Sequence, residues 1–319
     1  MPLPVPTAAG PILALGVLSG LGFLLIQARK RLVPTTLLTA WWWMAAVWLM
    51  WGLTAVWLAA GPPSREMTAQ LLYWTGIVAL CPGIAVLGAK RPGSRVWNLF
   101  ILMPLLLVLG WPAVTVWRLD GPRLFAAEIP VLVGLLLVLV MGTGNYLGTR
   151  FGGAAFAYGL AVVALIAPAT VLFAKGGGEA GIATPHPLFL LATLFLGLAG
   201  LLAWRAVRRP PTAERGTARL WADFREVFGI VWSRRLQDRL NQEGSRENWT
   251  AVVGPLGLEW PPEATPDADQ RLRVDRRFEH HLLWLLRRFV DRPWVDVRAD
   301  VVPGEQFAEP KGASPSRSS

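Results

Sequence analysis

Tryptophan is the residue type whose number and spacing give this sequence its clearest chemical feature. The chain of 319 residues has 17 tryptophans, and six of them fall between residues 41 and 57. On a helix that turns about 100° per residue, Trp41, Trp48 and Trp51 lie on one stripe. The stripe is either the wall of an apolar pocket for a lipid tail, quinone or porphyrin, or a packing surface whose indole N–H groups bind carbonyls of a neighbouring helix.

The titratable residues form no catalytic or metal-binding motif. Cys81 is the one cysteine, so the chain can form neither an intramolecular disulfide nor a cysteine-based metal cluster. The adjacent His280 and His281 would point about 100° apart on a regular helix, so we expect them to be solvated and not to share a metal ion. Because no paired acids and no histidine beside a serine or cysteine stand out, the sequence predicts no cofactor and no enzymatic activity.

Long apolar stretches must position the tryptophans. A hydrocarbon core of roughly 30 Å requires about 20 apolar residues of helix. By this measure we predict an all-α membrane protein with seven transmembrane helices, at residues 8–27, 37–60, 71–89, 97–117, 131–148, 154–174 and 188–207. None of these stretches has an ionisable residue near its centre, which argues against an ion-coupled pump.

The distribution of basic residues predicts the orientation of the helices. Loops rich in Arg and Lys stay in the cytoplasm because cationic side chains translocate poorly. One set of loops holds ten basic residues and the other set holds four. The richer set contains Arg29, Lys30, Arg31, Lys90, Arg91, Arg95, Arg150, Arg205, Arg208 and Arg209. We therefore predict an N-terminus outside and a C-terminal region in the cytoplasm. Since residues 1–7 carry no charge, a retained first helix is favoured over a cleaved signal peptide.

The formal net charge of +10 is explained mainly by this orientation signal, so no nucleic-acid partner is predicted. Arg outnumbers Lys by 27 to 4, and Ala, Gly and Pro are abundant. This composition is typical of bacteria with GC-rich genomes and predicts a multi-pass protein of the bacterial inner membrane, with the lipid bilayer as its first partner.

The run Cys81, Pro82, Gly83 interrupts the third apolar stretch. Proline removes a backbone hydrogen bond and bends a helix, and in membranes such a break is tolerated where neighbouring groups satisfy the freed carbonyl. The run is therefore either a hinge, with a discontinuous helix that binds a ligand, or a kink that improves packing.

After the predicted membrane domain of residues 1–209, the composition becomes that of a soluble protein. We predict a small, mainly helical cytoplasmic domain at residues 210–302 and a disordered tail at residues 303–319, which is rich in Pro, Ser and Gly. The domain is expected to contain a helix with an apolar face from Leu220 to Val231, a break at residues 244–246, a hairpin within residues 249–260 and a second helix at about residues 269–291.

The second helix of this domain is basic and amphipathic. Its apolar face is expected to pack on the first helix, while its other face carries Arg273, Arg277, Trp284 and Arg288. Such a face can lie on an anionic membrane surface or bind an acidic partner. We predict that a cytoplasmic protein binds the domain through this face.

The stretch from Cys81 to Asn98, with Pro82, the loop Lys90-Arg91-Pro92-Gly93 and then Trp97, is similar to a stretch in uncharacterised multi-pass membrane proteins of planctomycete bacteria. The resemblance covers under a tenth of the chain and implies a bacterial membrane location, without a chemical activity.

Three functions compete on these observations. The charge-free helices and the basic cytoplasmic domain favour a non-enzymatic scaffold or assembly subunit. The tryptophan stripe and the proline-interrupted helices support, as the alternative, a permease for a neutral, hydrophobic or lipidic small molecule. The third candidate, an intramembrane enzyme, lacks residues to perform catalysis.

Overall fold

The computed structural model describes residues 9–60, 65–91, 96, 98–118, 129–169, 185–210, 216–263 and 266–299. Over these residues the protein is all-α apart from one short hairpin. The chain divides into two compact units. The first contains residues 1–210 and 225–232, and the second contains residues 211–224 and 233–319. The tail predicted to be disordered, residues 303–319, lies outside the described residues.

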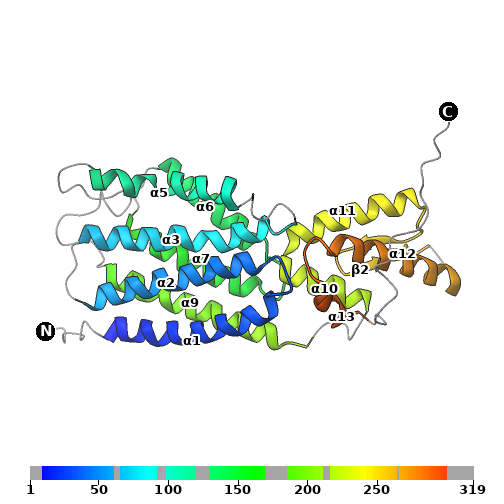
Figure 1. The fold of residues 1–319 in the computed structure, drawn as a ribbon, viewed down its shortest axis with the longest axis horizontal. Helices are drawn as coiled ribbons and strands as arrows, with labels where there is room; N and C mark the ends of the chain where they lie inside the picture. The colour runs from blue at the N-terminus through cyan, green and yellow to red at the C-terminus, as the bar shows by residue number, and fades with distance from the viewer. Residues whose placement is uncertain are drawn as a thin grey trace. The chain divides into compact units, whose positions relative to one another are not determined.

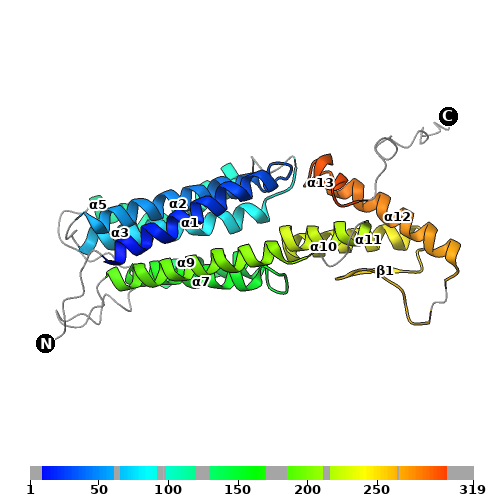
Figure 2. The ribbon, with the colours of Figure 1, turned by 90° about the horizontal axis from the view of Figure 1, so that it is seen from below.

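The first unit is built from apolar helices that run side by side (Figures 1 and 2). They are α1 (Ala9–Leu32), α2 (Leu38–Ala59), α3 (Arg65–Leu87), the π-helix η1 (Asn98–Leu102), α5 (Met103–Arg118), α6 (Ile129–Gly144), α7 (Gly152–Ile166), the 3-10 helix η2 (Ala167–Ala169) and α9 (Pro185–Arg208).

Four of these helices are long and apolar enough to cross a membrane, which confirms four of the seven predicted spans by length and composition. The sufficient stretches are Ile12–Leu32, Leu38–Ala59, Met67–Leu87 and Pro187–Arg208. The other three predicted spans contain shorter apolar helices, at Phe100–Val114, Ile129–Gly144 and Gly152–Ile166. A helix of 16 residues such as α6 reaches only about 24 Å, less than the roughly 30 Å of a hydrocarbon core.

Local chemistry explains why these three helices are shorter than predicted. A turn at residues 145–149 ends α6, and its Gly148 has a left-handed φ of +77°. Pro168 lies in η2, directly after α7, where its missing N–H interrupts the helical ladder. Pro104 follows η1 and divides the fourth predicted span into a π-helix and an α-helix.

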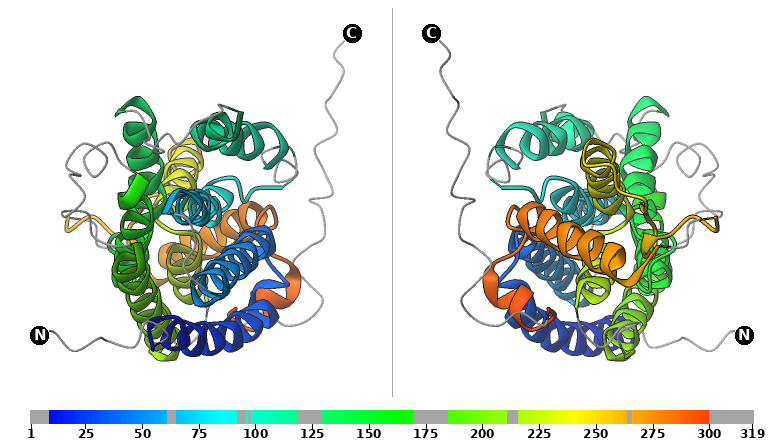
Figure 3. Two further views of the ribbon diagram at one scale, coloured as in Figure 1. Left: turned by 90° about the vertical axis from the view of Figure 1, so that its left-hand side faces the viewer. Right: turned by 90° about the vertical axis from the view of Figure 1, so that its right-hand side faces the viewer.

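The central helix of the first unit is α3. It contacts α2, α5, α6, α7 and α9, and it lies among the other helices in the end-on view (Figure 3, left, light blue). Of its most apolar window, 72% is buried, against 11% for α1 and 28% for α2 and α9. The side chains that a lipid would otherwise contact are therefore covered in α3 by protein.

The second unit packs helices against a hairpin. Its elements are α10 (Thr217–Phe228), α11 (Ile230–Arg246), β1 (Val252–Gly254), β2 (Gly257–Glu259), α12 (Ala268–Leu286) and α13 (Arg292–Asp296), of which α10 and α11 also contain the segment 225–232. The strands are antiparallel with Gly254 opposite Gly257, so the predicted hairpin is confirmed. Asn241 and Gln237 of α11 hold the hairpin through hydrogen bonds to the backbone of Val253.

The predicted apolar face of α12 is confirmed as part of the core of this unit. Phe278, Leu282 and Leu286 are at most 3% exposed, and Asp267 caps the helix by accepting from the Gln270 N–H at 2.6 Å. Beyond the helix, the Phe289 ring lies 5.3 Å from the Phe224 ring of α10 in an edge-to-face contact. The two predicted helices of the domain therefore do share a core.

Two helix boundaries in this region were predicted incorrectly. A single helix was expected to run from Leu220 through Val231, but α10 ends at Phe228 and α11 begins at Ile230, with Gly229 between them at a left-handed φ of +82°. The helix expected to reach residue 291 ends at Leu286. A new helix, α13, starts soon after with a proline at one of its first positions, which separates the two.

Candidate functional site

Two members of the tryptophan stripe, in the first half of α2, form hydrogen bonds to α1. The Trp41 Nε1–H donates to the Leu25 carbonyl at 2.8 Å, and the Trp48 Nε1–H donates to the Leu18 carbonyl at 2.7 Å. The guanidinium of Arg29 lies 5.5 Å from the Trp41 ring centroid, which adds a cation–π contact near the end of α1. These are the bonds that a helix-packing surface makes.

The third member of the stripe reaches α9. Trp51 is fully buried, and its Nε1–H donates to the Thr193 hydroxyl at 3.0 Å. That hydroxyl in turn donates to the Phe189 carbonyl at 2.8 Å, so the indole is held by a side chain and not by the carbonyl that the sequence suggested. The stripe thus joins α2 to both α1 and α9.

Replacing Trp51 with alanine is expected to destabilise the first unit by about 3–5 kcal/mol, because it removes a large buried ring and leaves a cavity. Thermal unfolding of the purified protein in detergent measures the effect. The matched control is Trp42→Ala in the same helix, where the ring is 57% exposed and the cost should be about 1 kcal/mol or less. Equal losses for the two variants would contradict a specific packing role for Trp51.

The run Cys81, Pro82, Gly83 lies inside a continuous helix. α3 extends through Pro82 without interruption. The Tyr158 hydroxyl of α7 donates to the Ala79 carbonyl at 2.7 Å, one turn before the proline. A Cβ added to Gly83 would lie 3.0 Å from the Cα of Gly142 in α6, so the backbones of the two helices are in close contact. Here the run forms a packing site for α6 and α7.

Asn145 caps two helices at once. It lies in the turn after α6 and is 2% exposed. Its Nδ2 donates to the Phe228 carbonyl at 3.1 Å, at the end of α10. Its Oδ1 accepts from the Val231 N–H at 3.0 Å and its carbonyl accepts from the Ile230 N–H at 2.8 Å, at the start of α11. The sequence did not indicate these partners.

Further contacts surround this cap, all within the first unit. The Arg150 N–H donates to the Glu226 carboxylate at 2.5 Å, and Arg225 Nη2 donates to the Gly148 carbonyl at 2.9 Å. The Trp232 Nε1–H donates to the Val86 carbonyl at the end of α3, at 2.9 Å. We call residues 225–232 the docked segment, because these bonds make it part of the first unit.

The basic residues predicted to form an interaction face lie on the second unit. Arg273 and Arg277 are exposed on α12, and Trp284 is 39% exposed on the same helix. Arg288 lies just beyond the helix end, and its guanidinium is 5.2 Å from the Trp284 ring centroid. The guanidinium of Arg287 is 4.8 Å from the same ring. Aromatic and cationic groups are therefore assembled at the C-terminal part of α12.

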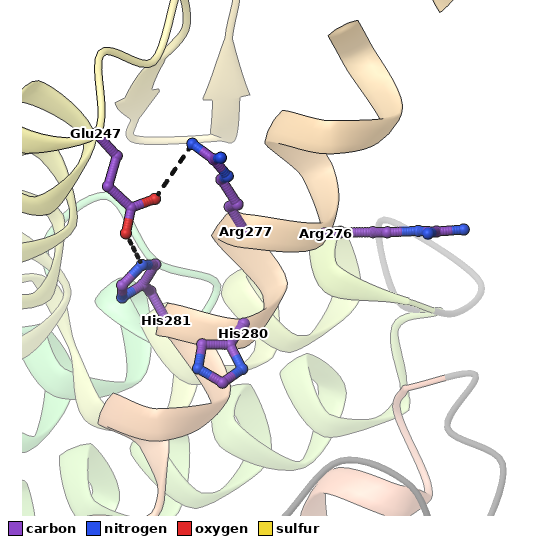
Figure 4. Close-up of a pocket in the computed structure, with 5 residues that line it drawn as sticks. All are labelled: Glu247, Arg276, Arg277, His280 and His281. Atoms are coloured by element: carbon purple, nitrogen blue, oxygen red, sulfur yellow. Dashed lines mark hydrogen bonds and ion pairs between the residues drawn. The ribbon is translucent and has the colours of Figure 1, made fainter. Parts of the chain in front are cut away.

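Next to this face, a surface depression of about 400 Å³ is lined by Glu247, Arg276, Arg277, His280 and His281 (Figure 4). His281 Nε2 lies 2.9 Å from Glu247 Oε1, and Arg277 Nη1 lies 3.6 Å from Glu247 Oε2. A carboxylate accepts hydrogen bonds only, so Nε2 of His281 carries the proton. The prediction that both histidines are simply solvated is therefore wrong for His281. Glu247, which is 34 residues away in the sequence, lies within hydrogen-bond distance of its ring.

Burial by itself would raise the pKa of Glu247, but its contacts reverse the shift. Hydrogen bonds from Trp249 and His281, and the charges of His281 and Arg277, lower the pKa below its ordinary value of 4.5. The contacts therefore stabilise the folded unit at pH above 4.5, and this contribution is lost as the pH falls through the lower pKa of the folded state.

The Glu247→Gln variant should lose this component of acid sensitivity. Its stability deficit relative to the unsubstituted protein is expected to be largest near neutral pH and to shrink as the pH drops below about 4. Urea unfolding of the purified protein, followed at a series of pH values, measures the difference. A deficit that is the same at every pH would show that ionisation of Glu247 does not contribute.

Over the part of the chain that the structure describes, no group of three or more His, Cys, Asp and Glu residues could hold a metal ion. The sequence missed both the docked segment and the Glu247 contacts. One local signal was available for the first: a glycine within an amphipathic helical pattern, Gly229, costs helix stability and marks a break. No comparable signal pointed to Asn145 or Glu247 as the partner.

Comparison with protein-family models, curated proteins and solved structures gives no match.

Proposed function

We propose that this protein is a non-enzymatic scaffold or assembly subunit of the bacterial inner membrane. In this proposal seven helices cross the bilayer, which thins locally around the three shorter ones. The N-terminus lies outside, and residues 210–302 present an interaction domain to the cytoplasm. Support for the orientation comes from the ten-to-four distribution of basic residues between the two sets of loops. Four of the helices have the length and apolarity that spanning requires.

The observation that carries the proposal is the cationic and aromatic surface of α12. Arg273, Arg277 and Trp284 are exposed on a helix whose opposite face is buried in the second unit. Arginine and tryptophan are enriched where protein interfaces concentrate their binding energy. The surface fits an acidic protein partner, because arginine forks bind carboxylates in a bidentate way. In the first unit, the buried indole and hydroxyl groups of Trp51 and Thr193 are instead satisfied within the unit.

The partner surface is tested by site-specific photo-crosslinking in cells, with a photoreactive residue at position 284. The expected result is a discrete adduct with an acidic protein, and co-purification of that protein that falls at least tenfold in an Arg273→Glu and Trp284→Ala double variant. The matched control is Arg246→Glu, an exposed arginine of α11 outside the α12 surface. Unchanged co-purification in the double variant would overturn the proposal.

Orientation is tested separately by cysteine accessibility. In a Cys81→Ser background, single cysteines placed at residue 31, in the last turn of α1, and at residue 91, after α3, should react with a membrane-permeant reagent and resist an impermeant one added from outside. Labelling of either position from outside would contradict the proposed arrangement.

A further inference from the structure

The depression beside α12 has more positive charge than its one acid balances. Its lining includes two guanidiniums, those of Arg276 and Arg277, and a single carboxylate, that of Glu247. Glu247 engages Arg277 and His281, while Arg276 extends away from it (Figure 4). Among the described residues, the guanidinium of Arg276 makes no hydrogen bond or ion pair. Even with both imidazoles neutral, the lining keeps an excess of one positive charge.

The lining also offers hydrogen-bond donors from one helix. Arg276, Arg277, His280 and His281 come from two successive turns of α12, and the extended Arg276 side chain leaves its guanidinium available to a ligand (Figure 4). The ring centroids of His280 and His281 are 5.7 Å apart. Arginine supplies five N–H donors and no acceptor, and Arg277 approaches Glu247 through Nη1, at 3.6 Å. A ligand that matches this lining must bring several acceptor oxygens and negative charge.

We propose that this depression binds the phosphate group of a phosphomonoester, either free or as a lipid headgroup. A phosphomonoester carries about −1.5 to −2 charges at neutral pH and three strong acceptor oxygens, which suits two guanidiniums and two imidazoles better than a single carboxylate does. The volume of about 400 Å³ lies in the range of small-molecule sites, roughly 300–1,000 Å³, so part of the ester fits beside the phosphate group. Glu247 orients Arg277 and His281 without occupying Arg276 or His280.

The proposal goes beyond the scaffold function and does not depend on it. Arg277 belongs to both surfaces, but it is changed in neither test: the phosphate site is tested at Arg276 and His280, and protein docking at Arg273 and Trp284. Each can therefore fail while the other holds.

The test uses the full chain in nanodiscs of phosphatidylcholine. For the free form, glycerol 3-phosphate is titrated by calorimetry. For the lipid form, co-flotation is measured with separate phosphatidylcholine vesicles that contain phosphatidic acid, a phosphomonoester. Vesicles with phosphatidylglycerol, a phosphodiester, are the comparison. Saturable binding in the first arm identifies a soluble ligand, and co-flotation with phosphatidic acid alone identifies a lipid headgroup.

Arg276→Gln and His280→Gln are the deciding variants. Each is expected to weaken phosphomonoester binding about tenfold or more. Arg276→Gln removes the positive charge and the guanidinium fork, and His280→Gln replaces the ring N–H with a flexible amide. Arg273→Gln removes the same charge one turn earlier on α12 and outside the depression, and should keep the affinity within about twofold. Absence of binding in both arms, equal binding of phosphatidylglycerol, or equal losses for Arg273→Gln and Arg276→Gln would overturn the proposal.

Discussion

Replacing Gly229 with alanine is expected to detach the docked segment and to lower stability by about 2–5 kcal/mol. The backbone at Gly229 has a φ of +82°, which costs an L-residue about 1–2 kcal/mol. The new Cβ would also overlap the amide and carbonyl of Asn145, with the backbone oxygen at 2.5 Å. Such overpacking adds typically about 1–3 kcal/mol. Thermal unfolding and hydrogen exchange of residues 225–232 measure the two consequences.

A second glycine separates the two causes. Gly216, before α10, has nearly the same φ of +83°, but a Cβ there would meet nothing within 4 Å. Gly216→Ala should therefore show only the backbone cost of about 1–2 kcal/mol, with normal exchange in the docked segment. If both alanine variants lost the same stability, the contact with Asn145 would contribute nothing.

Replacing Asn145 with alanine is expected to cost about 2–5 kcal/mol, because it leaves the Phe228 carbonyl and the Val231 N–H without their side-chain partner in a buried place. Hydrogen exchange resolves the effect by residue. The Val231 amide, which donates to Asn145 Oδ1, should exchange much faster. The Ile230 amide donates to the backbone carbonyl of residue 145 and should keep more of its protection.

Asn241→Ala is the matched control for this loss. The Asn241 side-chain amide also forms two hydrogen bonds to backbone groups, both of Val253 in the hairpin. Its Oδ1 accepts from the Val253 N–H at 2.8 Å, and its Nδ2 donates to the Val253 carbonyl at 3.0 Å. It should expose Val253 and leave the docked segment protected. Faster exchange of Ile230 and Val231 in the Asn241 variant would show that the docked segment opens with the second unit and is not held by Asn145.

The two large effects should also be coupled. Alanine at position 145 removes the amide that alanine at position 229 would overlap, so the double variant is expected to lose less stability than the two single variants together. Strict additivity would mean that the two residues act independently.

Predictions from the sequence succeeded where structure depends on short segments. The four membrane-length helices follow from runs of apolar residues, and the hairpin around Pro255 follows from its turn residues. The buried face of α12 follows from the helical spacing of its apolar residues. The prediction of a single helix through Gly229 was wrong. It followed the apolar spacing from Leu220 to Val231 and gave too little weight to the glycine, the residue that permits a left-handed break.

The sequence by itself determined which segments are apolar enough for a membrane and where basic charge accumulates, because both properties are local sums over side chains. Only the tertiary structure decided that Asn145 caps α10 and α11, from 83 and 86 residues away along the chain, and that Glu247 holds His281 across 34 residues. A hydrogen bond requires donor and acceptor within about 3 Å. That proximity depends on how the helices pack, and it cannot be predicted from the spacing of residues along the sequence.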